Sequence, residues 1–236
     1  MRARTSPCLR GATLVAAAAL ALACGGGDAP TTPRESEPAY DPRAFAFDES
    51  GALHGYLYHW ATGRTVRVYV DPTAEPQGSD LRAAVVAGAS LWAGTVRNGE
   101  VSIAVASSPA QADVIVHYGD APRLVGPGGC APPASGGVGA TFLCPDFDGA
   151  TLATLPLLAG GGGSVKMDVA VYRGAVADEA QFRRVVAHEL GHVLGIGAHS
   201  PSSADLMFGS PAVSAPSPAD GRTLRYVLQH EADLRP

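Results

Sequence analysis

The sequence contains few charged side chains, and those it has carry an acidic excess. Only 17% of the 236 residues are charged, and 22 acidic against 17 basic side chains give a formal net charge of -5. A chain without a basic excess has no global cationic field, so binding to nucleic acid through a basic face is not expected. The hydrophobic content of 46% instead indicates a globular protein, and the length fits one domain.

The N-terminal apolar run is too short to span a bilayer. It covers residues 11–23, which is 13 residues, whereas a membrane-spanning helix needs about 20. It follows Arg2, Arg4 and Arg10, and a positive start before a short apolar core is typical of an export signal. We therefore expect residues 1–23 to be a signal peptide.

Two cleavage routes are open at the end of this segment. The small residues Ala21 and Ala23 fit ordinary signal peptidase, which would release a secreted protein. Cys24 follows them directly, with a run of glycines behind it, and this resembles a bacterial lipoprotein junction. We expect an exported protein of the cell envelope, lipid-anchored through Cys24 at the outer membrane or cell surface, or else secreted. Membrane contact is expected only through that lipid.

Cysteine is scarce, with four in the whole chain. Cys8 lies in the signal segment and Cys24 is the candidate for lipidation, so only Cys130 and Cys144 are left in the mature domain. In an oxidising compartment such a pair predicts a disulfide, and closing a loop of about 15 residues is worth ~3 kcal/mol. Two unrelated buried thiols are the alternative.

The mature chain divides into a polar segment and a folded domain. Residues 24–44 are rich in Gly, Pro, Thr and Glu, which is the composition of a flexible tether, so the folded domain is expected at 45–236. Alternating and helical apolar patterns predict strands and helices within it. The predicted strands are residues 65–70, 101–106, 112–118, 137–144 and 165–172, and the first helix begins at residue 79 or 80. The glycine-rich strand 137–144 is expected at a sheet edge.

The residues that can carry chemistry lie on a second helix, predicted from Asp178 onward. Asp178 and Gln181 can form a capping box, and apolar residues then recur every three or four positions. His188 and His192 in the segment HELGH lie one helical turn apart on the same face, so they can bind one metal ion. Glu189 falls between the polar and apolar faces, where an unpaired carboxylate is costly unless it has a function.

A third ligand is predicted after the end of this helix. Gly195 is expected to stop the helix and Gly197 to permit a further non-standard turn, so that His199 can return to the same ion. Three imidazoles leave one of the four positions of zinc open, which is the catalytic arrangement rather than the structural one. Glu189 is then the expected general base.

The segment HELGHVLGIGAHS, with Met207 eight residues after His199, resembles the active site of the metzincin zinc peptidases, and among them the matrixins. His199 stands one position later than in the family pattern HExxHxxGxxH, with Gly197 and Ala198 absorbing the insertion. The resemblance implies an α+β domain with a twisted, mostly parallel five-stranded sheet, an antiparallel edge strand, an active-site helix and a C-terminal helix. It places Met207 in a Met-turn beneath the metal.

The resemblance also implies the function. We expect a zinc-dependent metalloendopeptidase with one catalytic zinc ion held by His188, His192 and His199, and with a peptide or protein substrate added as a strand to the edge of the sheet. We expect a monomer, and no second, structural zinc, because Lys166 occupies a strand position where the family has a ligand histidine. The alternative is a non-catalytic zinc-binding surface lipoprotein of the same fold, which has no need of Glu189.

Overall fold

The structure is a computed structural model that describes residues 33–47, 53–71, 81–118, 138–143, 167–171 and 176–231. The predictions of a signal peptide at 1–23, of a lipid on Cys24 and of a disulfide between Cys130 and Cys144 concern positions outside these ranges. Within the described ranges, no helix has the length and apolar character needed to cross a membrane.

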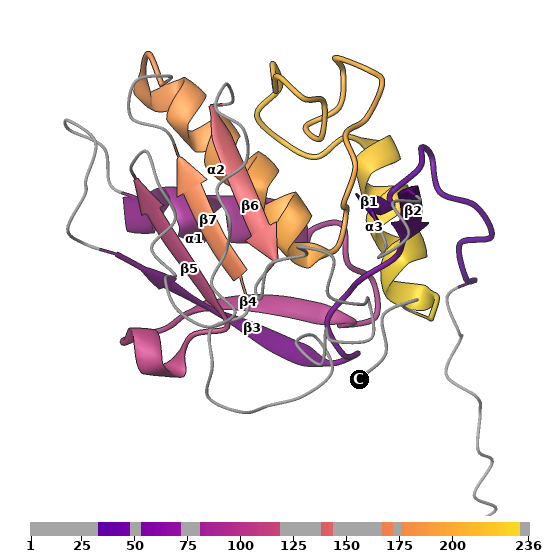
Figure 1. Ribbon diagram of the computed structural model, residues 1–236, viewed down its shortest axis with the longest axis horizontal. Coiled ribbons are helices and arrows are strands. Elements are labelled where there is room, and N and C mark those ends of the chain that lie inside the picture. The colour runs from indigo at the N-terminus through magenta and orange to yellow at the C-terminus, as the bar shows by residue number, and fades with distance from the viewer. Residues whose placement is uncertain are drawn as a thin grey trace, which may run out of the picture. The chain divides into compact units, whose positions relative to one another are not determined.

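The protein is an α+β domain built on a five-stranded mixed sheet, as predicted (Figure 1). The strands lie in the order β4-β3-β5-β7-β6, with parallel pairing except between β6 and β7, which are antiparallel. Their bounds are β3 Arg64–Val70, β4 Val101–Val105, β5 Val114–Tyr118, β6 Gly139–Leu143 and β7 Met167–Val171. The short strand β6 is therefore the antiparallel edge that the glycine-rich pattern predicts.

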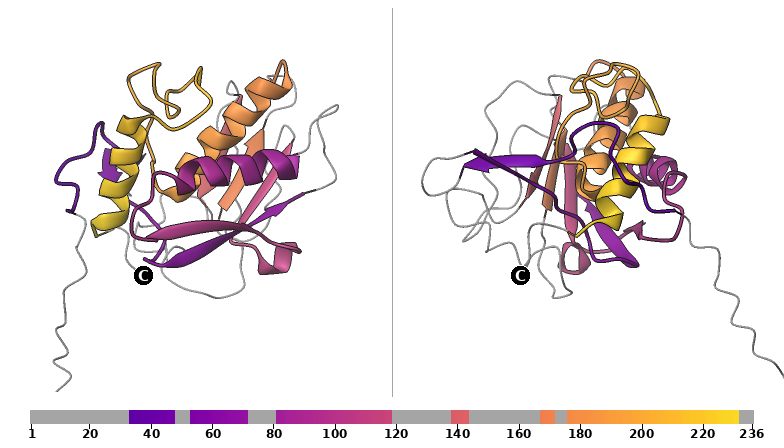
Figure 2. Two further views of the ribbon diagram at one scale, coloured as in Figure 1. Left: turned by 180° about the vertical axis from the view of Figure 1, so that it is seen from behind. Right: turned by 90° about the vertical axis from the view of Figure 1, so that its right-hand side faces the viewer.

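Two helices cover one face of this sheet (Figure 2). They are α1, Leu81–Ala93, and α2, Glu179–Leu194, and they also pack on each other. The alternation in β3 puts its valines into the core beneath the helices, whereas every residue of β7 is buried. The helices approach closely because Gly88 of α1 has no side chain, since a Cβ there would lie 2.9 Å from Leu190 Cδ1. This packing fixes α2 against the sheet and against β6.

The ends of α2 follow the sequence, with one difference. The Asp178 side chain accepts a hydrogen bond from the Gln181 backbone N–H at 2.7 Å, as expected for an N-cap. The predicted capping box also requires the Gln181 side chain to accept a hydrogen bond from Asp178 N. The Gln181 side chain instead accepts from Ala177 N. Gly195 ends the helix with a φ of 124°, a left-handed backbone that favours glycine.

The prediction of a tether at 24–44 is wrong for residues 33–44, which we call the strap. The strap packs on the third helix, α3, Pro218–Gln229, and belongs to the compact unit that begins at Thr32. Its contacts are specific: Ala39 N donates to Thr223 Oγ1 at 3.0 Å, and the Tyr40 hydroxyl donates to Asp220 Oδ1 at 2.6 Å. Composition could not predict this packing, because a polar segment can be held by buried hydrogen bonds as well as by apolar area.

The strap leads into a small hairpin that the sequence patterns do not predict. Strand β1, Ala44–Phe47, pairs antiparallel with β2, Leu53–Tyr56, as a separate two-stranded sheet. The chain then reaches the core through Tyr58 and Trp60, both almost fully buried. Trp60 Nε1 donates to the carbonyl of Val193 at 2.7 Å, so this N-terminal region also supports the end of α2.

Candidate metal centre

Three histidine side chains converge at the C-terminal end of α2. His188 and His192 lie one turn apart on the helix, as predicted, and His199 returns to them from the chain beyond it. The potential ligand atoms of the three rings all lie within 4.8 Å of one another, and the ring centroids are 4.8 to 5.2 Å apart. His188 is buried, His192 is half-buried and His199 is exposed, so the cluster is open on the side of His199.

The backbone fixes which nitrogen of each helical histidine is free. His188 Nδ1 lies 2.7 Å from the carbonyl oxygen of Leu206, and His192 Nδ1 lies 2.6 Å from that of Ile196. A carbonyl oxygen can only accept, so both Nδ1 atoms carry the hydrogen. In a neutral imidazole the other nitrogen is then a bare lone pair, and the two Nε2 atoms face each other at 3.2 Å.

Electrostatics favours the neutral rings. Burial lowers the pKa of His188 to about 4, with the neighbouring His199 adding to the effect. Burial also lowers the pKa of His192 well below its usual value, and the two other histidines lower it further. Burial lowers the pKa of His199 as well. Two lone pairs that face each other without a proton between them repel, and a metal ion bound by both nitrogens could remove this repulsion.

The turn that carries His199 is held on both sides. Before it, Gly197 N donates to the carbonyl of Pro42 in the strap at 2.7 Å. After it, Ser200 N donates to the carbonyl of Met207 at 2.8 Å. The reason for a glycine at 197 differs from the predicted one. Gly197 does not have a positive φ. A Cβ at this position would lie 2.5 Å from Ala44 N, so glycine is needed here because the strap backbone passes close to it.

Met207 lies fully buried beneath the histidine-bearing helix. A Cβ on Gly191 of α2 would lie only 2.3 Å from Met207 Sδ, so the glycine between the two helical histidines lets the methionine pack directly on the helix. The Met-turn role expected for Met207 stays a prediction, because it concerns a metal ion.

A buried carboxylate on α3 fixes the turn around Met207. Asp220 is fully buried and accepts hydrogen bonds from Leu206 N at 2.8 Å and Ser217 N at 2.9 Å, in addition to the Tyr40 hydroxyl. The carbonyl of Leu206 accepts a hydrogen bond from His188 Nδ1. Asp220 therefore helps to orient the His188 ring by holding the Leu206 backbone in place. α3 is the C-terminal helix that the resemblance implies, but the sequence patterns indicated no role for Asp220.

The side chain of Glu189 extends from α2 toward the edge strand β6. It is 3% exposed, and its Oε2 accepts a hydrogen bond from the Thr141 hydroxyl at 2.7 Å. The carboxylate also lies against Gly139, where a Cβ would come within 2.7 Å of Oε1. Burial raises the pKa of Glu189 to about 7, partly offset by the Thr141 hydrogen bond. Glu189 is not part of the ligand cluster, although it is next to His188 in sequence.

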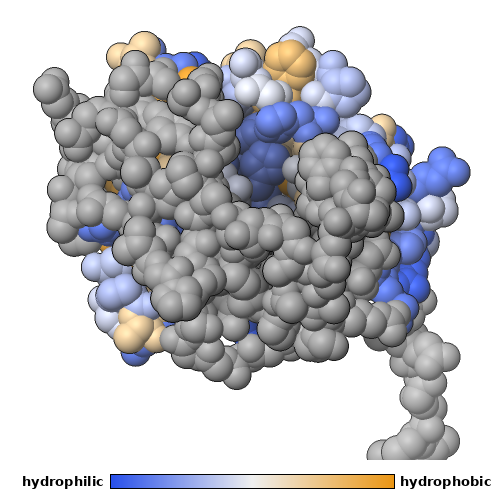
Figure 3. All heavy atoms as spheres, in the orientation of Figure 1, coloured by the Kyte–Doolittle hydropathy of each residue, from blue (hydrophilic) through white to orange (hydrophobic). Residues whose placement is uncertain are grey.

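Gly139 and Thr141 were missed as site residues by the sequence analysis. They are two positions apart on β6 and therefore point to the same side of the sheet, toward α2. One signal in the sequence could have identified them. A small residue and a polar residue alternate on a predicted edge strand, and the predicted helix carries a carboxylate that needs a partner. In the space-filling view, strongly hydrophilic residues of the described chain are exposed in the upper middle of the visible face (Figure 3).

A second buried histidine lies away from this cluster. His117 of β5 and Asp168 of β7 are both fully buried, with His117 Nε2 2.7 Å from Asp168 Oδ1. The three clustered histidines are the only group of three or more potential ligands in the described part of the chain.

The site is therefore an open set of three neutral imidazoles with a buried carboxylate beside it, and it could bind a metal ion. No protein-family model matches the sequence, and no curated protein shows significant similarity to it.

Proposed function

We propose that this protein is a zinc-dependent endopeptidase with a matrixin-like catalytic domain. The observation that carries the proposal is the 3.2 Å separation of the bare Nε2 atoms of His188 and His192, with His199 beside them. Two nitrogens that bind one tetrahedral zinc ion at ~2.0 to 2.1 Å lie about 3.3 Å apart. Imidazole nitrogens are also ligands that zinc prefers, so the donor set and its spacing both fit this metal.

The three histidines would fill three of the four positions around the ion and leave one open. When bound, a zinc ion supplies Lewis acidity, which lowers the pKa of water in the open position and polarises a substrate carbonyl. The hydrogen bonds from His188 to Leu206 and from His192 to Ile196 keep both Nε2 atoms directed into the cluster. Such backbone partners orient metal-binding imidazoles and raise their affinity.

Glu189 would act as the proton carrier. Thr141 occupies its Oε2, while among the described residues Oε1 accepts no hydrogen bond. Oε1 can therefore accept a proton from the attacking water and pass it to the leaving amine. The raised pKa that burial gives this carboxyl suits a group that must both take and return a proton near neutral pH.

The substrate would be an extended peptide bound along β6. This strand is at the edge of the sheet and pairs with β7 on one side, and no other strand of the described residues pairs with it. A peptide added to the free edge would be recognised through its backbone. Because Glu189 contacts Gly139 and Thr141 of this strand, the proton carrier lies at the place where such a peptide would run.

Cleavage of a protein substrate by the zinc-loaded chain tests the proposal. Wild type is compared with Glu189→Gln, which keeps the shape of the side chain but removes its basicity. Glu179→Gln is the matched control, because Glu179 is on the same helix, is 53% exposed, and among the described residues forms an ion pair with Arg183 alone. We expect new peptide termini with wild type and control, none with Glu189→Gln, and none after chelation. Equal cleavage by Glu189→Gln would refute the proposed role.

The competing function is a metal-binding module without catalysis. The specific observation in its favour is that Glu189 is 3% exposed and hydrogen-bonded to Thr141, as an ordinary structural carboxylate would be. The same experiment separates the two functions, since a chain that binds one zinc and cleaves nothing is a binding module. For either function we propose an exported, monomeric protein, tethered by a lipid on Cys24 or secreted.

A further inference from the structure

We propose that the strap, residues 33–44, is a positioning element of the metal centre that holds the turn carrying the third ligand, His199. This inference rests on the proposed zinc site and concerns how its most exposed ligand is kept in place. His188 and His192 are fixed by their helix, whereas His199 lies outside any helix or strand and is exposed. Its position therefore depends on what restrains the turn.

The turn between α2 and His199 is one residue longer than the HExxHxxGxxH spacing, and the strap contacts the extra length directly. Gly197 N donates to the carbonyl of Pro42, which is buried, as is Tyr40 of the strap. The missing side chain at Gly197 lets the strap backbone pass, since a Cβ there would lie 2.5 Å from Ala44 N and 2.8 Å from Ala44 Cα. Both contacts are made at Gly197, two residues before His199.

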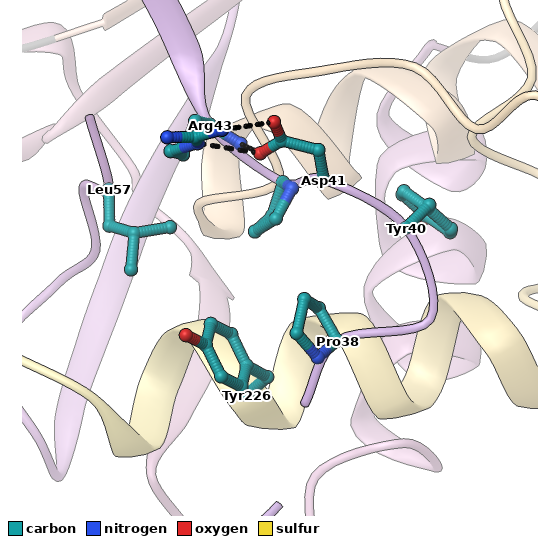
Figure 4. A pocket seen from close by; sticks show the side chains of 7 residues that line it. Pro38, Tyr40, Asp41, Arg43, Leu57 and Tyr226 are labelled. Carbon is teal, nitrogen blue, oxygen red and sulfur yellow. Dashed lines mark hydrogen bonds and ion pairs between the residues drawn. The ribbon is translucent and has the colours of Figure 1, made fainter. Parts of the chain in front are cut away.

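The strap is attached at discrete points rather than along its whole length. Tyr40 is anchored to Asp220, and Pro42 is anchored to Gly197. Between strap residues 38–43 and the Tyr226 side chain of α3 lies a cavity of about 480 Å³, which Leu57 also lines (Figure 4). Because the strap does not pack continuously on the helix here, the Pro42 contact is a local restraint on the turn.

The two anchors also lead to the same metal cluster from different sides. Tyr40 bonds the carboxylate of Asp220, which binds Leu206 N, and the Leu206 carbonyl orients His188. Pro42 holds the turn before His199. The strap therefore contributes to the placement of two of the three histidines, although among the described residues none of its hydrogen bonds is made to a histidine of the cluster.

Gly197→Ala in the full chain is the direct test, with zinc affinity measured by competition with a chromophoric chelator. The added Cβ cannot fit against Ala44, so the strap must separate from the turn. We expect zinc to bind about tenfold more weakly, the lower end of what loss of an outer-shell contact costs. Gly94→Ala is the matched control, because a Cβ there would be 3.5 Å from its nearest neighbour, Leu91 O. It should leave zinc affinity unchanged.

A double-mutant cycle with His199→Ala separates positioning from a general structural defect. If the strap acts through His199, Gly197→Ala should have no further effect on zinc affinity once His199 is gone. An equal loss in both backgrounds, or no loss in the wild-type background, overturns the inference. If Gly197→Ala does not fold, Pro42→Gly replaces it in the same cycle, because it loosens the strap and adds no atoms.

The failure of this inference can be distinguished from failure of the proposed function. A wild-type chain that binds no zinc refutes the zinc site itself, and the positioning role with it. A wild-type chain that binds zinc and cleaves its substrate, but is insensitive to Gly197→Ala, leaves the function intact and refutes only the role of the strap.

Discussion

The substitution Tyr40→Phe removes one oxygen atom from the strap and tests whether this polar segment is part of the folded domain. The Tyr40 side chain is 8% exposed, and its hydroxyl donates at 2.6 Å to the fully buried carboxylate of Asp220. A hydrogen bond to a charged group contributes about 1.5 to 3 kcal/mol to stability. Asp220 keeps its bonds from Leu206 N and Ser217 N, so the loss should stay within this range.

Thermal and urea unfolding measure the effect. For a domain of this size each kcal/mol corresponds to about 2 to 4 °C, so the melting temperature should fall by roughly 3 to 12 °C. Tyr226→Phe is the control, because the Tyr226 hydroxyl makes no hydrogen bond among the described residues and its ring stacks on His230. A loss below about 0.5 kcal/mol for Tyr40→Phe, or a loss equal to that of the control, would show that the strap is not fixed by this bond.

Three further results are expected. Burial raises the pKa of Tyr40, so above pH ~10 only the unfolded state ionises. Between pH 9 and 11 the wild type should therefore lose about 1.4 kcal/mol of unfolding free energy relative to Tyr40→Phe, measured by urea unfolding, and parallel losses would contradict this. Gly191→Ala should lower the free energy of unfolding by about 1 to 3 kcal/mol or more, because the new Cβ would clash with Met207 Sδ. An unchanged melting temperature in thermal unfolding would count against that packing. Gly139→Ala should lower the rate of cleavage at unchanged zinc content, because its Cβ would displace Glu189 Oε1, and full activity would argue against catalysis by this carboxylate.

The helix and its histidines could be predicted because their determinants are local. Asp178 caps the helix, apolar residues recur at helical spacing, and Gly195 ends it, so the sequence alone puts His188 and His192 on one face. The mostly parallel sheet with an antiparallel edge followed from the strand patterns together with the resemblance to the matrixins. The helix depends on residues close together in the chain, whereas the order of the strands joins distant segments and was expected only from the resemblance.

The missed features depend on contacts between distant residues. Tyr40 and Asp220 are 180 positions apart, and Thr141 and Glu189 are 48 positions apart, so no periodicity connects them. The polar composition of the strap therefore indicated a tether, although one buried carboxylate on α3 was enough to hold Tyr40. Gly197 was identified as important, but for its backbone freedom rather than for the close approach of the strap.

X-ray absorption at the zinc edge on the zinc-loaded protein tests the metal centre most directly. Three imidazole nitrogens and one oxygen at ~2.0 to 2.1 Å are predicted, with one nitrogen lost in His199→Ala. The potential ligand atoms of the three rings already lie within 4.8 Å of one another, so no large movement is needed to form this shell. Four protein ligands would indicate a closed structural site, and an unchanged spectrum for His199→Ala would contradict the assignment of the third ligand.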